Sequence, residues 1–207
     1  MRVVFMGTPD FGIPTLEKLN ELHEVVGVVT QPDRPRGRGG KVLPSPVKAR
    51  AIELGLPVFQ FEKISKEGVE TLKSLNPDVM VTAAYGQILS DEILSLAPHG
   101  VLNVHGSILP LYRGSSPIQH AVLNGDSETG VTIMKTAREV DSGDIVLIKK
   151  TPITSTDGTV SLFDRLAQIG ADALIESLDL LVSGEITFTP QSTKKPLFVR
   201  CSPSRTQ

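Results

Sequence analysis

Short runs of apolar and β-branched residues recur in the first half of the chain, and segments with helical periodicity separate them. The runs read RVVFM at 2–6, EVVGVVT at 24–30, DVMVTAA at 78–84 and VLNVH at 101–105. Strands that alternate with helices form βαβ units, in which the strands are parallel and the helices lie on both faces of one sheet. The pattern therefore predicts an α/β fold, an open doubly wound, mainly parallel sheet with helices on both faces.

Three Ser/Thr-Pro pairs mark expected helix starts, at residues 8–9, 45–46 and 116–117. Each pair places a side-chain acceptor just before a proline at the first helical position. Gly55 and Gly125 follow two of these segments, and glycine suits the left-handed conformation that ends a helix.

The pattern changes after Gly130. Residues 131–137 and 145–153 predict two strands joined by a loop with a turn at 141–143, which indicates an antiparallel edge. From residue 156 an apolar stripe predicts one long helix that ends near Gly184. Residues 186–190 then predict a last strand, and a polar, proline-interrupted tail follows.

Candidate chemistry lies at one strand end. Alternate residues of a strand project to the same side, so Asn103 and His105 share one space where ligands of such sheets bind. If the later loop brings Asp141 to them, the three could hold a neutral amine, move its proton and stabilise an oxyanion at a carbonyl. A structural strand-end histidine is the alternative. The remaining histidines read as surface or packing residues: His23, His99 and His120.

The connection that follows this strand, residues 107–117, is longer than the roughly 2 to 6 residues usual between a strand and a helix. We expect it to contact substrate rather than to be a plain connection. Residues 7–12 follow the first strand but match neither a dinucleotide fingerprint nor a lysine-containing phosphate loop. A capped turn that lines the cleft is the better interpretation.

Composition limits the possibilities. With 207 residues, 40% hydrophobic and 21% charged, the chain suits one core with an appendage rather than two full domains. The net charge of −2 argues against global attraction to nucleic acid, yet residues 34–50 carry six basic and no acidic residues. This segment predicts an arm that meets phosphates; a solvated loop is the alternative.

The only cysteine, Cys201, allows no intramolecular disulfide and no Cys-x-x-Cys pair, which fits a reducing compartment. The first apolar run is too short for a signal-peptide core or a membrane span. We therefore expect a cytoplasmic protein without membrane attachment; removal of a transit peptide is the alternative.

Taken together, five motifs resemble the methionyl-tRNA formyltransferases over about residues 1–189. They are MGTPDFG at 6–12, TQPDRPRGRGGKVLPSPVK at 30–48, AAYGQIL at 83–89, LNVHGSILPLYRGSSPIQHAVLNGDSETGVTIM at 102–134 and VDSGDIV at 140–146. Asn-x-His with a later Asp is shared by the wider group of formyltransferases that use 10-formyltetrahydrofolate, including those acting on glycinamide ribonucleotide and sugar nucleotides. It therefore indicates the chemistry, whereas the basic segment resembles the insertion that engages the acceptor end of initiator tRNA.

The resemblance implies a Rossmann-like formyltransferase fold and transfer of a formyl group from 10-formyltetrahydrofolate to the α-amino group of methionyl initiator tRNA, in translation initiation and without a metal. Asn103 would donate to the oxyanion, His105 would stabilise charge and move a proton, and Asp141 would orient His105 and help to accept the amine proton. An α-amine with a pKa of about 8 is partly neutral at cellular pH, so a modest base suffices.

The resemblance also implies binding residues. The expected tRNA contacts are Arg34, Arg36, Arg38 and Lys41. The expected folate contacts are Gly86, Gln87, Ile88, Leu89, Ser107, Ile108, Leu109, Pro110, Val140 and Asp144. Ile108 replaces the usual leucine of this family, a swap of similar volume that should be tolerated.

Members of this family continue through a linker into a C-terminal β-barrel, and residues 190–207 do not resemble that linker. We expect a catalytic domain at 1–189, a tail at 190–207 and a monomer that keeps folate binding and formyl transfer but transfers to tRNA more weakly. The alternatives are a formyltransferase for sugar nucleotides or other small amines, a hydrolase that releases formate from formyl-folate, and a catalytically idle RNA-binding domain.

Overall fold

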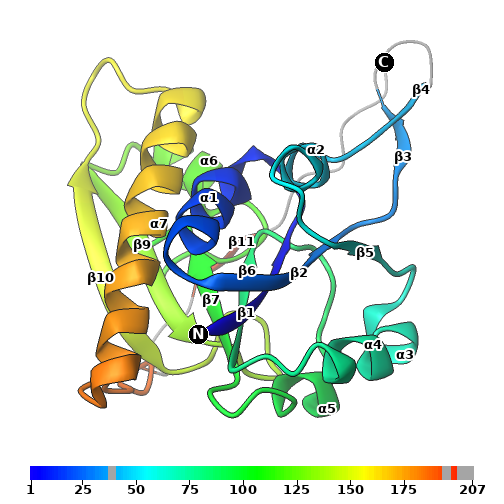
Figure 1. The fold of residues 1–207 in the computed structure, drawn as a ribbon. Helices are drawn as coiled ribbons and strands as arrows, with labels where there is room; N and C mark the ends of the chain where they lie inside the picture. Colours follow the sequence, from blue (N-terminus) through cyan, green and yellow to red (C-terminus); the bar gives the residue numbers. More distant parts are fainter. Residues whose placement is uncertain (37–40, 193–196, 200–207) are drawn as a thin grey trace.

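The computed structural model describes residues 1–36, 41–192 and 197–199. A seven-stranded sheet with the order β10-β9-β7-β6-β1-β2-β5 forms its centre (Figure 1). The strands are β1 (Arg2–Gly7), β2 (Glu24–Thr30), β5 (Val58–Gln60), β6 (Val79–Ala83), β7 (Val101–His105), β9 (Glu128–Lys135) and β10 (Ile145–Pro152). The pairs among β5, β2, β1, β6 and β7 are parallel, and β9 and β10 add an antiparallel edge. The predicted mainly parallel sheet and its antiparallel edge are confirmed.

The central strand shows why the apolar runs are continuous rather than alternating. Val3 and Phe5 of β1 point into one core, and Val4 and Met6 point into a second core on the opposite face. All four side chains are fully buried. A strand covered on both faces has no solvent side, so no polar residue interrupts it.

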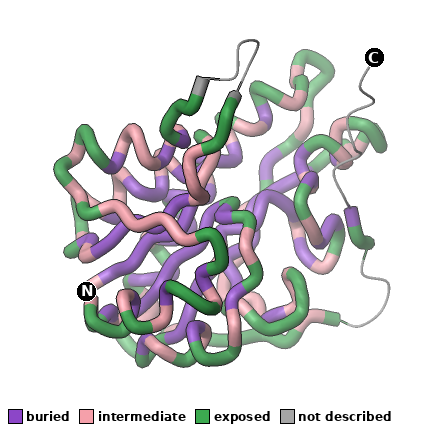
Figure 2. The backbone as a smooth tube through the Cα atoms, turned by 90° about the vertical axis from the view of Figure 1, so that its right-hand side faces the viewer, coloured by how far each residue is buried: buried purple, intermediate pink, exposed green. Residues whose placement is uncertain are grey.

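Helices cover both faces of the sheet, as the alternation of elements predicted (Figure 1). The first core is closed by α1, α2, α6 and the long α7, and the second by α3, α4 and α5. Their bounds are η1 (Asp10–Gly12, a 3-10 turn), α1 (Ile13–Leu22), α2 (Pro46–Glu53), α3 (Ile64–Glu67), α4 (Val69–Ser74), α5 (Asp91–Leu94), α6 (Pro117–Leu123) and α7 (Thr159–Ser183). Figure 2 shows the result, a buried sheet inside a largely exposed periphery.

Two of the three predicted helix starts are confirmed. The Oγ atom of Ser45 accepts from the backbone N–H of Lys48 at 3.2 Å, and α2 begins at Pro46. The helix α6 begins at Pro117, although Ser116 makes no side-chain cap. Gly55 and Gly125 adopt positive φ after α2 and α6, as expected.

The start predicted at residues 8–9 is wrong. The 3-10 turn η1 follows Pro9, and α1 begins only at Ile13. The Oγ1 atom of Thr8 donates to the carbonyl oxygen of Tyr85 at 2.9 Å, which ties the first turn to the end of β6. The hydroxyl is therefore used between elements and not to cap a helix.

The C-terminal part also differs from the prediction. The long helix α7 is confirmed, but residues 186–190 form only one bridge, between Thr189 and Ile145, because Pro190 has no N–H to extend the pairing. Instead β11 (Phe198–Val199), in the predicted tail, pairs in parallel with β8 (Arg113–Gly114).

The basic segment is more regular than its glycine and proline content suggested. Its strands β3 (Arg34–Arg36) and β4 (Lys41–Leu43) pair antiparallel, and the hairpin stands away from the central sheet beside α2 (Figure 1). Within the part of the chain that is described, none of the helices is both long and apolar enough to span a membrane.

Candidate active site

The carboxyl ends of β6 and β7 hold the candidate catalytic residues. Asn103 and His105 lie on β7, and the connection between β9 and β10 brings Asp141 to them. The Nδ2 atom of Asn103 donates to Oδ1 of Asp141 at 3.5 Å, and Nδ1 of His105 lies 3.6 Å from Oδ2. The structure thus brings together the three residues that the sequence analysis grouped.

The hydrogen bonds of His105 determine where its proton sits. Its Nε2 atom lies 3.0 Å from the carbonyl oxygen of Tyr112, which only accepts hydrogen bonds, so Nε2 carries a hydrogen. In the neutral ring Nδ1 then has no hydrogen and faces the carboxylate of Asp141. A proton added at Nδ1 is stabilised by that carboxylate, so this side of the ring is arranged to accept one.

Tyr112 is itself anchored. Its hydroxyl donates to Oδ2 of Asp126 at 2.6 Å and accepts from Nδ2 of Asn124 at 2.9 Å. Burial, together with the hydrogen bond to Asp126, raises the pKa of the Tyr112 phenol, so the hydroxyl remains a donor at neutral pH. These bonds hold the side chain of the residue whose backbone carbonyl contacts His105.

Thr82 orients the Asn103 amide. The two residues are neighbours in the pairing of β6 with β7, and the Thr82 hydroxyl donates to Oδ1 of Asn103 at 2.8 Å. Because the amide oxygen accepts this bond, the amide nitrogen must point the other way, toward Asp141. The donor that an oxyanion would need is thus already aimed.

Asp141 sits in a turn with a positive φ of 49°, a conformation that aspartate tolerates better than most residues. Its Oδ2 atom accepts from the backbone N–H of Gly114 at 2.8 Å. Its backbone carbonyl accepts from Nε2 of Gln191 at 2.9 Å. Both ends of the residue are therefore held by other parts of the chain.

These groups open into a cavity of about 600 Å³. Its volume falls in the range of small-molecule sites, about 300 to 1,000 Å³, and apolar walls with few polar groups are typical of them. Pro9 and Phe11 contribute to the wall, as expected for the turn after β1. The expected folate contacts that line it are Gly86, Gln87, Ile88, Leu89 and Val140.

The comparisons with known proteins identify the group to which the chain belongs. The profile of the family described as "Formyl transferase" matches residues 1–178. The chain belongs to the formyl transferase family. The resemblance seen in the five motifs is confirmed at this level.

Two curated relatives carry the name methionyl-tRNA formyltransferase. The protein of Sulfurihydrogenibium sp. (strain YO3AOP1) is 48% identical over 97% of this chain, and that of Listeria monocytogenes serovar 1/2a is 47% identical over 96%. The chain spans 65% and 64% of the length of these relatives.

Solved structures of other formyl transferases share the fold. A glycinamide ribonucleotide transformylase of Symbiobacterium toebii superimposes with a TM-score of 0.76 at 18% identity, covering 93% of this chain and 94% of that one. An N-formyltransferase of Helicobacter canadensis, in complex with folinic acid and dTDP-3-aminofucose, gives 0.74 at 17% identity, covering 95% and 70%. The Rossmann-like formyltransferase fold is therefore confirmed.

Some expected folate contacts do not line the cavity of this formyl transferase: Ser107, Ile108, Leu109, Pro110 and Asp144. The Ser107 hydroxyl donates to the carbonyl of Leu111 at 2.6 Å, and Thr132 on β9 bonds to the backbone of Ser107 and Leu109 at 2.7 and 3.1 Å. These bonds hold the loop against the sheet and deliver the Tyr112 carbonyl to His105.

Sequence reasoning missed four residues of the site: Thr82, Tyr112, Gly114 and Gln191. For Thr82 the only indication in the sequence is that its hydroxyl interrupts the apolar run at 78–84. The others act through the backbone or lie far along the chain, and no local pattern marks them.

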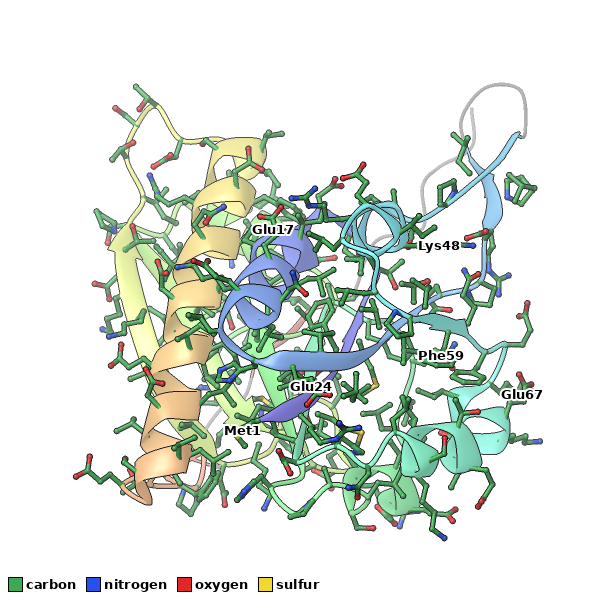
Figure 3. The ribbon with its side chains drawn as sticks, in the orientation of Figure 1. Met1, Glu17, Glu24, Lys48, Phe59 and Glu67 are labelled. Carbon is green, nitrogen blue, oxygen red and sulfur yellow. The ribbon has the colours of Figure 1, made fainter. Side chains whose placement is uncertain are left out.

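The basic hairpin lies apart from the cavity. Arg34 is exposed, and its Nη2 atom lies 3.2 Å from Oε2 of Glu62. Arg36 and Lys41 pair through their backbones, and Arg38 lies outside the described residues. At the base of the hairpin Lys48, labelled in Figure 3, bonds to Asp33 and to Gln60.

Burial raises the pKa of the Tyr85 phenol beside this cavity, so the ring stays uncharged at neutral pH. Over residues 1–36, 41–192 and 197–199, no three His, Cys, Asp or Glu side chains gather in a way that could hold a metal ion.

Proposed function

We propose that this chain transfers the formyl group of 10-formyltetrahydrofolate to the α-amino group of methionyl initiator tRNA. The main support is that the side chains of Asn103 and His105 both face the carboxylate of Asp141, and that all three residues line one cavity. Two relatives at 47 and 48% identity are named for this activity. We further propose that the chain acts as a monomer in the cytoplasm and uses no metal.

The cavity suits a folate. Its apolar wall includes Ile88 and Val140, which are 74% and 52% exposed and so free to cover a flat aromatic ring. Residues 86–89 lie outside any helix or strand; the carbonyl of Ile88 accepts from the Ser65 hydroxyl at 3.0 Å, and the other backbone groups could meet the polar edge of such a ring. We infer that the folate lies against residues 86–89 and Val140, while residues 107–110 and Asp144 support the site from behind.

The reaction has two steps: the α-amine attacks the formyl carbon, and the N10 atom of the folate then leaves. The neutral α-amine adds to the formyl carbon and forms the new C–N bond, while the carbonyl electrons move onto oxygen. Asn103 donates to that oxyanion through the amide nitrogen that Thr82 has aimed. The carbonyl then re-forms as the bond from carbon to the N10 atom of the folate breaks.

One proton must move from the amine to N10 during these steps. Nδ1 of His105 accepts it from the amine, with the Asp141 carboxylate stabilising the charged ring. The same atom returns it to N10 as that nitrogen leaves. The side chains begin and end in the same protonation state, so atoms and charge balance.

The basic hairpin favours tRNA as the acceptor over a sugar nucleotide. In the sequence Arg34, Arg36, Arg38 and Lys41 follow one another over residues 34–41, in a chain whose net charge is −2. Guanidinium and ammonium groups bind phosphates, and phosphate contacts fix the position of a nucleic acid without reading its sequence. The hairpin would hold the acceptor end while the cavity receives the methionyl amine.

The test compares formylation of methionyl initiator tRNA by the wild type, Asn103→Ala, His105→Ala and Asp141→Asn. Loss of the oxyanion donor should lower kcat about 10²- to 10³-fold, and loss of the proton acceptor about 10²- to 10⁴-fold. The exposed residues His99→Ala and Asp164→Asn serve as matched controls with unchanged rates.

Wild-type rates in all three site variants would refute the mechanism. A sugar nucleotide or free amine formylated better than tRNA would refute the acceptor, and release of formate without an acceptor would indicate a hydrolase.

A further inference from the structure

Three consecutive residues connect the two titratable groups of the site. The carbonyl of Tyr112 accepts from His105, and the N–H of Gly114 donates to the carboxylate of Asp141. Arg113 lies between them and is only 8% exposed. A shift of this short segment would therefore move His105 and Asp141 relative to each other.

Gln191 joins Arg113 to the turn that carries Asp141. Its Nε2 atom donates to the carbonyl oxygens of Asp141 at 2.9 Å and Gly143 at 2.7 Å. Its Oε1 atom accepts from Nε and Nη2 of Arg113 at 3.1 and 2.7 Å. A primary amide provides both donors and acceptor in one group, which neither a carboxylate nor an apolar side chain can do.

The C-terminal segment supports the Arg113 side of this connection. The backbone N–H of Arg113 donates to the carbonyl of Leu197 at 2.8 Å, and the guanidinium lies 5.8 Å from the ring centre of Phe198. The carbonyl oxygen of Val199 lies so close to Gly114 that a Cβ there would meet it at 2.1 Å. Only glycine allows this approach.

We propose that Gln191, held by Arg113, is a positioning residue for formyl transfer. The two bonds from its amide nitrogen hold the turn at 141–143, in which Asp141 adopts the left-handed conformation that aims its carboxylate at Asn103 and Nδ1 of His105. Gln191 lies beyond residues 1–178, the part matched by the family profile. This inference rests on the proposed function, because Asp141 matters there as a partner of the proton-accepting ring.

The first experiment measures kcat and KM for Gln191→Leu and Gln191→Glu. Glutamate keeps an acceptor for Arg113 but has no donor for the turn, so both variants should lose kcat about 10- to 100-fold, the cost of a misplacement near 1 Å. KM for the folate should change less than kcat, since residues 86–89 of the folate wall lie apart from the turn and only Val140 adjoins it. The exposed Gln168→Leu on α7 is the matched control and should behave as wild type.

A double-mutant cycle separates positioning from general support. If Gln191 acts through Asp141, Gln191→Leu should cost nothing further in an Asp141→Asn background. Equal losses in both backgrounds, or a wild-type kcat in both Gln191 variants, would overturn the proposal.

Amide hydrogen exchange over residues 138–145 provides a readout that needs no turnover. Exchange should be faster in Gln191→Leu than in wild type and unchanged in Gln168→Leu. Unchanged exchange in Gln191→Leu overturns the positioning role. If the wild type fails to formylate tRNA, the proposed function alone has failed, and the exchange result still decides whether Gln191 holds the turn.

Discussion

Asn103 and His105 are each held by a partner on the side that faces away from Asp141. Thr82 occupies the oxygen of Asn103, so the amide nitrogen points to Asp141 and keeps a second hydrogen for another acceptor. The Tyr112 carbonyl occupies Nε2 of His105, so Nδ1 is the ring nitrogen on the side of Asp141. Such preorganisation matters because donors already in place need no reorientation when charge develops.

At this scale we predict the effect of Thr82→Val. The change keeps the shape but leaves Oδ1 of Asn103 without its donor, a penalty of about 1 to 3 kcal/mol, so the amide should rotate and kcat should fall about 10-fold. Steady-state kinetics of formyl transfer measure this fall.

The matched control for Thr82→Val is Thr15→Val. Thr15 is buried on α1, and its hydroxyl has no hydrogen-bond partner. Its replacement should leave kcat unchanged and should not lower the free energy of unfolding. If Thr82→Val equals Thr15→Val in kcat, Thr82 does not orient Asn103.

Among the helices, α7 packs directly against the strand that carries Asn103 and His105. It packs across the sheet next to β7, and Gly170 faces the strand so closely that a Cβ would lie 2.7 Å from Cγ1 of Val104. Val104 stands between Asn103 and His105 and is buried. The glycine thus sets how near α7 lies to the catalytic strand.

We predict that Gly170→Ala destabilises the protein. A β-branched valine in a core cannot turn aside easily, so overpacking should cost about 1 to 3 kcal/mol, more than the gain of up to about 1 kcal/mol from better helix propensity. Urea unfolding measures the difference.

The exposed neighbour Gln168→Ala is the control for Gly170→Ala and should stay within about 0.5 kcal/mol of wild type. If the free energy of unfolding of Gly170→Ala equalled that of Gln168→Ala, α7 could move away from the sheet at no cost in stability, and the prediction would be wrong.

Over the whole molecule, charge is distributed unevenly. The net charge is −2, and many acidic groups pair with bases at the surface, as Glu17 of α1 does with Arg50 of α2 at 2.7 Å. The Arg34–Glu62 pair is exposed on both sides, and such pairs contribute little, so Arg34 is free to exchange its partner for a phosphate.

We therefore predict that tRNA binding is salt-dependent through the hairpin. Arg34→Gln should weaken binding for every tRNA and reduce the slope of log Kd against log salt concentration by about 1. Filter binding at several salt concentrations measures the slope.

Lys150→Gln is the matched control for Arg34→Gln. Arg34 pairs with Glu62, which follows β5, whereas Lys150 lies on β10 at the opposite edge of the sheet. It should leave the slope unchanged. Identical slopes for the two variants would place the phosphate contacts elsewhere.

Local pattern carries information about groups that are near in the chain. The apolar runs determine the parallel strands because both of their faces are buried, and the two-residue period of a strand puts Asn103 and His105 on one side. Ser45 caps α2 because its acceptor lies three residues from the N–H it serves. These features were predictable because their partners lie within a few residues.

Contacts between distant elements carry no such local mark. Thr8 turns to Tyr85 instead of capping a helix, Thr82 meets Asn103 through strand register, and Gln191 reaches Asp141 from fifty residues away. The layered fold, the family and the three grouped residues Asn103, His105 and Asp141 could be inferred from the sequence alone. Only the tertiary structure decided which atom of each group faces the cavity, because that depends on hydrogen bonds that exist once the strands and loops have come together.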